Sequence, residues 1–248
     1  MDGVIESMTA HMVEDYCGMP GELGYSFFEQ DEFDAICIEA DRHGLQIAVH
    51  AIGDAAVNRT LNGYEAARLV NGWRDSRHRI EHIEMLLPSD LPRFADLGVM
   101  ASMQPTHAPG GVYPSEPILS MVGRKRMMTG YAWETIRRTG ARLVFASDWP
   151  VAPLDPLLGI KTAMTRRPTF DGAPDQRQSL YDSIAGFTSD GAFTAFEEGR
   201  KGVLAAGAMA DVVILNGDIE AAASEQIDSI NVAATICGGV LTYQRGGD

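Results

Sequence analysis

Residues 44–54 read GLQIAVHAIGD, and the apolar run 45–49 within them is rich in β-branched residues. Because this run lies between Gly44 and Gly53, it is typical of a buried strand in a parallel sheet. Residues 30–42 before it carry apolar side chains at helical spacing, and residues 55–70 after it continue as a second helical pattern. We expect Asp31 and Asp54 to cap these two helices.

The same alternation of strand and helix continues along the chain. Further strands are predicted at residues 79–85, 99–104 and 141–146, and further helices at residues 88–97 and 126–139. The basic run 124–126 is predicted to be a solvated helix start. Strands separated by helices indicate βα units, so the sequence predicts an α/β fold with a parallel sheet.

From about Val203 the pattern changes to short β-rich runs interrupted by glycines and by Asn216-Gly217. Such runs predict a small antiparallel β module appended to the α/β part. We place the boundary near residue 200.

The composition excludes some classes of protein and favours others. The 248 residues include 34 acidic and 20 basic ones, a formal charge of −14, which argues against a nucleic-acid partner. Hydrophobic residues make up 45% of the chain, as in globular proteins. The longest uncharged stretches are interrupted by Pro, Gly, Gln or Thr, so we expect no membrane span.

The N-terminal residues show neither a basic nor an apolar signal region, so we expect a cytoplasmic protein. Cys17, Cys37 and Cys237 are odd in number and lack CxxC spacing. They are predicted to be free thiols of a reducing compartment.

Three polar residues stand at the carboxyl ends of predicted strands, where catalytic and ligand-binding groups of parallel sheets collect. They are His50, His82 and Asp148. The spacing from His50 to His82 is about one βα repeat, and the spacing from His82 to Asp148 is about two. Singly, each is more often structural, as a hydrogen-bonded histidine or a turn aspartate. Together they predict a site for a divalent metal, with Zn, Mn, Fe and Co all compatible.

His107 follows the strand between those of His82 and Asp148 and is expected at the same rim. It is a candidate substrate-binding residue, and the alternative is a histidine of a surface loop. Neither GxGxxG, GxxxxGK[ST] nor GxSxG is present, so a dinucleotide- or phosphate-binding module has little support.

Several motifs together resemble the amidohydrolase superfamily, specifically its amidohydrolase-3 (YtcJ-like) branch. They are DGVIESMTA at 2–10, HAIGDAA at 50–56, RIEH at 79–82, QPTH at 104–107, SDWPV at 147–151 and EEGRKGVLAAGAMADVVILNGD at 197–218. The resemblance implies a TIM (β/α)8 barrel with a small β-sandwich and a metal-dependent hydrolase of C–N bonds in amides, formamides or N-acyl compounds. It also implies that His50, His82 and Asp148 bind metal, most simply zinc, and that Asp148 handles the proton of the attacking water.

The chain departs from the family pattern because it contains no H-x-H pair, which the family carries on its first strand. Residues 1–200 are therefore expected to form about strand 4 to strand 8 of the barrel, and residues 201–248 a portion of the β-sandwich. A half barrel leaves open edges, so we expect a homo-oligomer or a complementary N-terminal chain. The main hypothesis is an enzyme acting on a small amide-type substrate when complete. The alternative is a catalytically inactive fragment or pseudo-enzyme.

Overall fold

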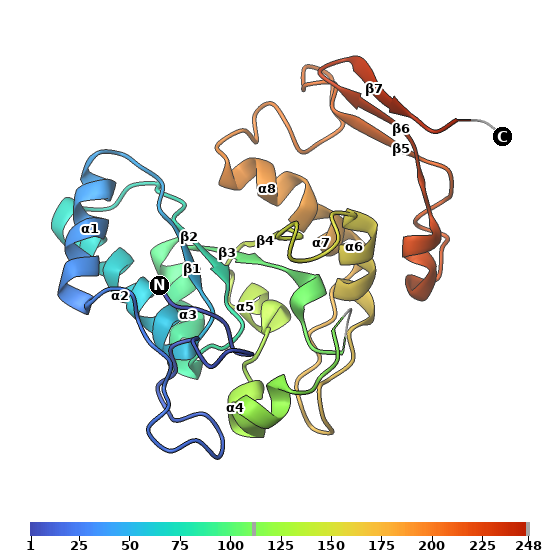
Figure 1. The fold of residues 1–248 in the computed structure, drawn as a ribbon. Helices are drawn as coiled ribbons and strands as arrows, with labels where there is room; N and C mark the ends of the chain where they lie inside the picture. The colour runs from blue at the N-terminus through green and yellow to red at the C-terminus, as the bar shows by residue number, and fades with distance from the viewer. Residues whose placement is uncertain (111–112, 247–248) are drawn as a thin grey trace.

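The central feature of the computed structural model, which describes residues 1–110 and 113–246, is a parallel sheet in the order β1-β2-β3-β4 (Figure 1). Its strands are β1 (Ala48–Ala51), β2 (Arg79–His82), β3 (Met100–Met103) and β4 (Leu143–Phe145). All neighbours pair in parallel, so the four carboxyl ends meet at one edge. The predicted α/β fold with a parallel sheet is confirmed.

Strand β1 begins later than predicted because the residues before it donate their hydrogen bonds to groups outside the ladder, although the carbonyl oxygen of Ile47 already accepts the amide of Arg79 on β2. The Ile47 amide donates to Nδ1 of His78 at 3.1 Å, and the Gln46 side chain donates to the carbonyl oxygens of Arg77 and Thr194. These bonds anchor the amino end of the strand, and the regular ladder starts at Ala48.

The helices flank the sheet, and three of them agree with the predicted segments. Their bounds are α1 (Gln30–Arg42), α2 (Asp54–Asn71), α3 (Leu91–Leu97), α4 (Ile118–Met127), α5 (Trp133–Arg138), α6 (Pro156–Thr165), α7 (Leu180–Phe187) and α8 (Ser189–Thr194), with short 3-10 turns η1 (Pro88–Asp90), η2 (Pro105–His107) and η3 (Ser224–Ser229). Helix α2 contacts β1, α5 contacts β3 and β4, and α7 and α8 contact β4. The largest fully buried side chains include those of Trp133, Phe94 and Ile80.

The predicted helix over residues 126–139 is wrong, because the chain breaks between α4 and α5. Tyr131 adopts a positive φ of 48°, and its amide donates to the carbonyl oxygen of Glu84 instead of to a preceding turn. The basic residues Arg124 to Arg126 consequently lie in the last turn of α4, not at a helix start.

The two predicted caps are also wrong. Glu29 occupies the N-cap position of α1, and Asp31 lies in the first turn. Gly53 occupies the N-cap position of α2, and the carboxylate of Asp54 accepts the amide of Val13 at 2.8 Å. Asp54 thus fastens the N-terminal segment to α2.

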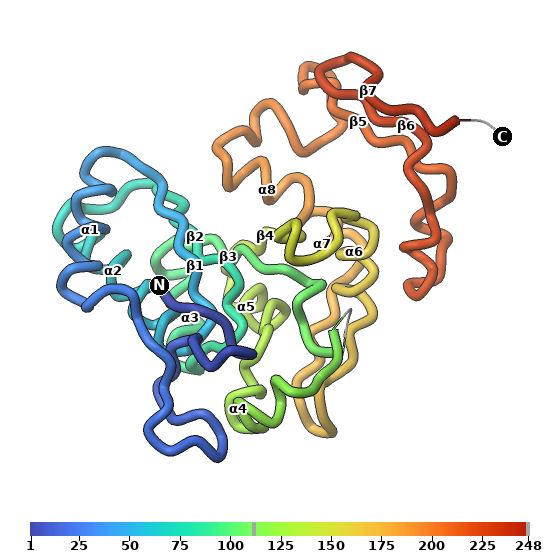
Figure 2. The backbone as a smooth tube through the Cα atoms, viewed as in Figure 1, coloured from blue at the N-terminus to red at the C-terminus, as the bar shows by residue number. Residues whose placement is uncertain are grey.

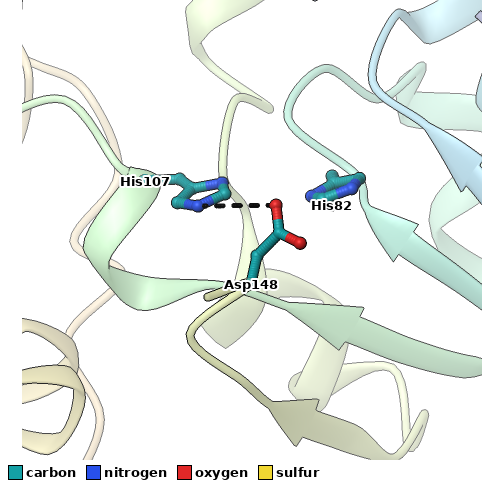
Figure 3. Close-up of side chains that lie close together, drawn as sticks. All are labelled: His82, His107 and Asp148. Atoms are coloured by element: carbon teal, nitrogen blue, oxygen red, sulfur yellow. Dashed lines mark ion pairs between the residues drawn. The ribbon is translucent and has the colours of Figure 1, made fainter. Parts of the chain in front are cut away.

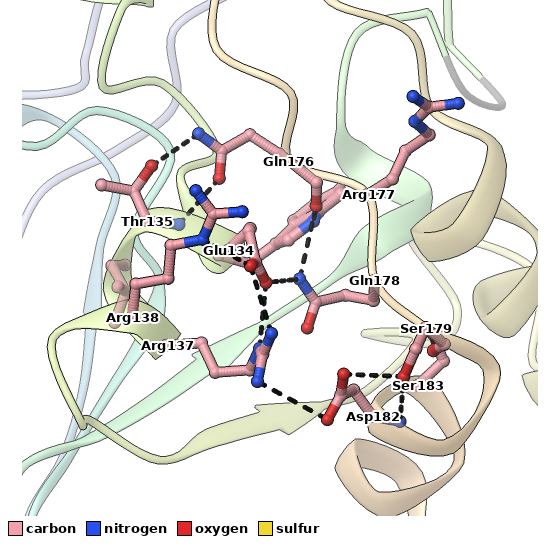
Figure 4. A network of polar contacts seen from close by, with 12 residues as sticks. Glu134, Thr135, Arg137, Arg138, Gln176, Arg177, Gln178, Ser179, Asp182 and Ser183 are labelled. Atoms are coloured by element: carbon pink, nitrogen blue, oxygen red, sulfur yellow. Dashed lines mark hydrogen bonds and ion pairs between the residues drawn. The ribbon is translucent and has the colours of Figure 1, made fainter.

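The connection from α6 to α7 is held against α5 by a polar network (Figure 4). The side chain of Gln176 makes two hydrogen bonds to Thr135: its Oε1 accepts the Thr135 backbone N–H, and its Nε2 donates to the Thr135 hydroxyl group. Gln178 donates to the carboxylate of Glu134 at 2.7 Å, which also pairs with Arg137. This network therefore holds the α6–α7 connection against α5, which packs on β4.

The C-terminal part forms a three-stranded antiparallel sheet of β5 (Val212–Leu215), β6 (Val232–Cys237) and β7 (Val240–Gln244). Figure 2 shows the irregular path by which the chain reaches this sheet from α8. Ile227 and Ile230 around η3 pack against Leu157 and Ile160 of α6. The predicted antiparallel module is confirmed, whereas a second sandwich layer is not seen among the described residues.

The parallel sheet is open within the described ranges, with β1 and β4 at its edges. The α-amino group of Met1 donates to the carbonyl oxygen of His50 at 2.7 Å, on the β1 side. A closed barrel is therefore not seen in this part of the chain.

None of the helices described here has the length and apolar character needed to cross a membrane.

Candidate functional site

The carboxyl ends of the parallel strands open into a cavity of about 470 Å³. All four residues singled out in the sequence line it, namely His50, His82, His107 and Asp148. The remaining lining residues are Val4, Glu6, Ile52, Glu84, Tyr113 and Val151. The four residues that the strand-end argument selects therefore line one cavity.

His82 is the last residue of β2 and projects into this cavity (Figure 3). Its Nδ1 lies 2.8 Å from Oε1 of Gln104. Because a carboxamide oxygen can only accept, Nδ1 carries the proton and Nε2 keeps its lone pair. Burial, and then the neighbouring His50, lower the pKa of His82 to about 4. The ring is therefore neutral at pH 7, as a metal ligand must be.

His50 lies on β1 with its ring centroid 4.6 Å from that of His82. Its Nε2 is 3.0 Å from the carbonyl oxygen of Gly3 and 3.7 Å from a carboxylate oxygen of Asp2. The N-terminal segment therefore sets the orientation of this imidazole.

His107 ends the turn η2 and lies between two carboxyl groups. Its Nε2 is 3.9 Å from Oδ2 of Asp148, and its Nδ1 is 3.9 Å from Oε1 of Glu84. This Nε2 is buried and has no hydrogen-bond partner among the residues that the structure describes. Burial lowers the pKa of His107, which favours the neutral imidazole.

Asp148 follows β4 and adopts a positive φ of 57°, a conformation that non-glycine residues seldom occupy. Figure 3 shows its carboxylate between the rings of His82 and His107, with the ion pair drawn to His107. One ligand atom each of His82, His107 and Asp148 lies within 4.8 Å of the others. Two imidazoles and a carboxylate around one point, with an unpartnered nitrogen among them, fit a divalent transition metal.

Glu84 is the lining residue that the sequence argument missed. It is buried, and the hydroxyl group of Tyr131 donates to its Oε2 at 2.8 Å. Burial raises the pKa of Glu84 to about 8, and the nearby carboxylates of Glu6 and Asp2 add to this effect. The signal was its position two residues after His82 in the predicted strand 79–85, where alternate side chains share a face. In the structure β2 ends at His82, and both His82 and Ile83 adopt a positive φ, so the turn and not the strand places Glu84 in the cavity.

A family model described as the amidohydrolase family (Amidohydro_3) matches residues 1–243. Among curated proteins, the chain is 35% identical to the protein LONG AFTER FAR-RED 3 of Arabidopsis thaliana, over 98% of this chain and 42% of that protein. It is 29% identical to the putative amidohydrolase YtcJ of Bacillus subtilis, over 98% of this chain and 46% of the relative. It is 26% identical to the N-substituted formamide deformylase of Arthrobacter pascens, over 93% and 42% respectively.

Two solved structures, both of uncharacterized metal-dependent hydrolases, share the fold. The protein from Pyrococcus furiosus has a TM-score of 0.70 and 31% identity, covering 82% of this chain and 40% of the other. The protein from Pyrococcus horikoshii OT3 has a TM-score of 0.72 and 26% identity, covering 84% and 41%. The chain spans less than half the length of the curated relatives that it matches.

Proposed function

Because the chain belongs to the amidohydrolase family, in its amidohydrolase-3 branch, we propose that it contributes the metal site of a hydrolase that cleaves C–N bonds. The observation that carries this proposal is the convergence of His82, His107 and Asp148 within 4.8 Å at the carboxyl edge of the sheet. Catalytic zinc sites use three protein ligands of these types and leave one position open.

The proposed substrates are small amides, formamides or other N-acyl compounds. The relative named as an N-substituted formamide deformylase supports this class of bond. The cavity of about 470 Å³ falls in the range of small-molecule sites.

In the proposed mechanism, His82 and Asp148 would hold the metal together with a third residue, for which the sequence predicts His50; zinc is the first candidate, and Mn, Fe or Co are others. In the described part of the chain, the ligand atoms found within 4.8 Å of one another belong to His82, His107 and Asp148 and not to His50. A bound divalent cation supplies Lewis acidity and makes water a competent nucleophile near neutral pH. Asp148 takes the proton of the attacking water and returns it to the leaving nitrogen. Because this carboxylate is half-exposed at the cavity, both the attacking water and the leaving nitrogen can reach it.

The proposed substrate-binding role of His107 is one of two that its position allows. His107 lines the cavity, where its imidazole would meet a substrate carbonyl. The same nitrogen faces Asp148, which is a proposed metal ligand.

We also propose that the folded chain works with a further polypeptide, either another copy or a complementary N-terminal chain. The open edges of β1 and β4 support this, because unpaired strand edges favour association.

The test combines two measurements on the purified chain. The first is zinc content per chain by mass spectrometry, with His82→Ala as the depleted variant and the exposed His43→Ala as a matched control. We expect about one ion per chain, lost only in His82→Ala. The second is amine release from a panel of N-formyl and N-acetyl amines. Metal binding without release of amine would favour the inactive alternative, and a folded chain without metal would contradict the proposed site.

A further inference from the structure

We infer that His107 is itself a metal ligand, and that Glu84, fixed by Tyr131, is the residue that positions it. This inference rests on the proposed metal site and assigns two residues beyond His50, His82 and Asp148.

The first support is that His107 repeats the arrangement of His82. The two rings are nearly parallel, with centroids 5.8 Å apart and planes inclined by 9°. Each ring directs its Nδ1 toward a side-chain oxygen, which is Oε1 of Gln104 at 2.8 Å for His82 and Oε1 of Glu84 at 3.9 Å for His107. In both rings this leaves Nε2 for a third group. A metal-binding histidine usually donates its other N–H to an oxygen acceptor. His82 does so at 2.8 Å, whereas Glu84 faces Nδ1 of His107 at 3.9 Å, beyond hydrogen-bond distance, and acts on this ring as a neighbouring carboxyl group.

The second support is the state of Nε2 in His107. This atom is buried, has no hydrogen-bond partner in the described part of the chain and lies 3.9 Å from Oδ2 of Asp148. A buried polar atom without a partner is costly, so such an atom calls for a ligand. His50 differs, because its Nε2 already bonds the carbonyl oxygen of Gly3.

The third support is the way Glu84 is held. The Tyr131 hydroxyl donates to Oε2 of Glu84, and the Tyr131 amide donates to the Glu84 carbonyl oxygen, both at 2.8 Å. The buried guanidinium of Arg166 in turn donates to the Tyr131 carbonyl oxygen at 2.7 Å. Oε2 is therefore occupied, and Oε1 is the oxygen left to face His107. A carboxyl group fixed in this manner can set the orientation of an imidazole without touching the ion.

The experiment measures the Zn²⁺ dissociation constant of the full chain by competition with a chromogenic chelator, and the visible spectrum of the Co²⁺ form. The variants are His107→Ala, Glu84→Leu, Glu84→Gln and Tyr131→Phe, with the exposed His43→Ala as control. Circular dichroism of each metal-free variant checks that it is folded.

We expect about 100-fold weaker binding for His107→Ala, with a changed Co²⁺ spectrum. We expect about 10- to 100-fold weaker binding for Glu84→Leu, and recovery of most of this loss in Glu84→Gln, which keeps an acceptor oxygen. Tyr131→Phe should fall between wild type and Glu84→Leu.

The inference is overturned if folded His107→Ala binds Zn²⁺ as tightly as the wild type does. The positioning role of Glu84 is overturned if His107→Ala weakens binding and Glu84→Leu does not. Tight binding that depends on His107, in a chain that hydrolyses no amide, would leave this inference standing and contradict the proposed function. If the chain hydrolyses an amide and His107→Ala leaves its Zn²⁺ affinity unchanged, the proposed function stands and this inference is contradicted.

Discussion

The carboxylate of Asp2 accepts the backbone N–H of Gly53 at 2.8 Å, although the two residues are 51 positions apart in the sequence. The same carboxylate accepts the amides of Ile52 at 3.0 Å and His11 at 2.8 Å. Gly53 is required here because a Cβ atom at this position would lie 2.0 Å from the carbonyl oxygen of His11. Asp2 therefore joins the N-terminal segment to the turn that follows His50.

Replacing Asp2 by alanine should lower the free energy of unfolding by about 3 kcal/mol, because three amides lose their acceptor. Urea denaturation followed by circular dichroism measures this loss. Asp31→Ala, on the exposed first turn of α1, serves as control and should change stability by less than about 0.5 kcal/mol. Equal stability of the two variants would show that Asp2 does not hold this turn.

Much of the α/β part could be predicted because its apolar periods are set by burial on the sheet. Helices α1 and α2 start close to the predicted residues, and all four parallel strands lie within the predicted segments or next to them. The break between α4 and α5 could not be predicted, since it depends on a bond from Tyr131 to the distant Glu84. Such tertiary contacts override local propensity.

The location of the candidate site could be predicted because parallel strands bring their carboxyl ends together. What could not be predicted is which nitrogen of each histidine is free. For His50 this depends on the carbonyl oxygen of Gly3, and for His82 on the side chain of Gln104. Glu84 was missed because its burial beneath Tyr131 is visible only in the fold.

Replacing Asp148 by asparagine should lower the hydrolytic kcat by a factor of about 10²–10⁴, since the amide cannot take a proton from water. The measurement is kcat on the best substrate of the amide panel, together with zinc content at saturating Zn²⁺. Asp171→Asn, in an exposed turn, should leave kcat unchanged. Near-normal turnover in Asp148→Asn would rule out the proton-transfer role.

The stability of the metal-free chain should depend on the ionisation of Glu84. The folded pKa is raised to about 8 by burial, from an ordinary value of 4.5. Folding therefore favours the neutral acid, and the stability that Glu84 contributes is fully present below pH 4.5 and is lost as the pH rises through about 8. Glu84→Gln cannot ionise, so its stability relative to the wild type should increase between about pH 4.5 and pH 8 and level off at higher pH, with a slope of at most about 1.4 kcal/mol per pH unit. Urea midpoints across this range measure the difference, and parallel curves for the two proteins would contradict the expectation.

The exposed antiparallel sheet should drive association of the isolated chain. Val213 and Tyr243 lie opposite Thr235 on neighbouring strands, so they share one face, and they are 57% and 48% exposed. Apolar side chains on a sheet favour a second layer, because sheets stack to bury such faces. The double variant Val213→Lys/Tyr243→Lys should shift the chain toward monomer, as measured by sedimentation velocity over a range of concentrations. Leu204→Lys, also exposed but outside the sheet, is the matched control and should leave the distribution unchanged. If Leu204→Lys dissociates the assembly and the double variant does not, association depends on the loop before β5 and not on this face.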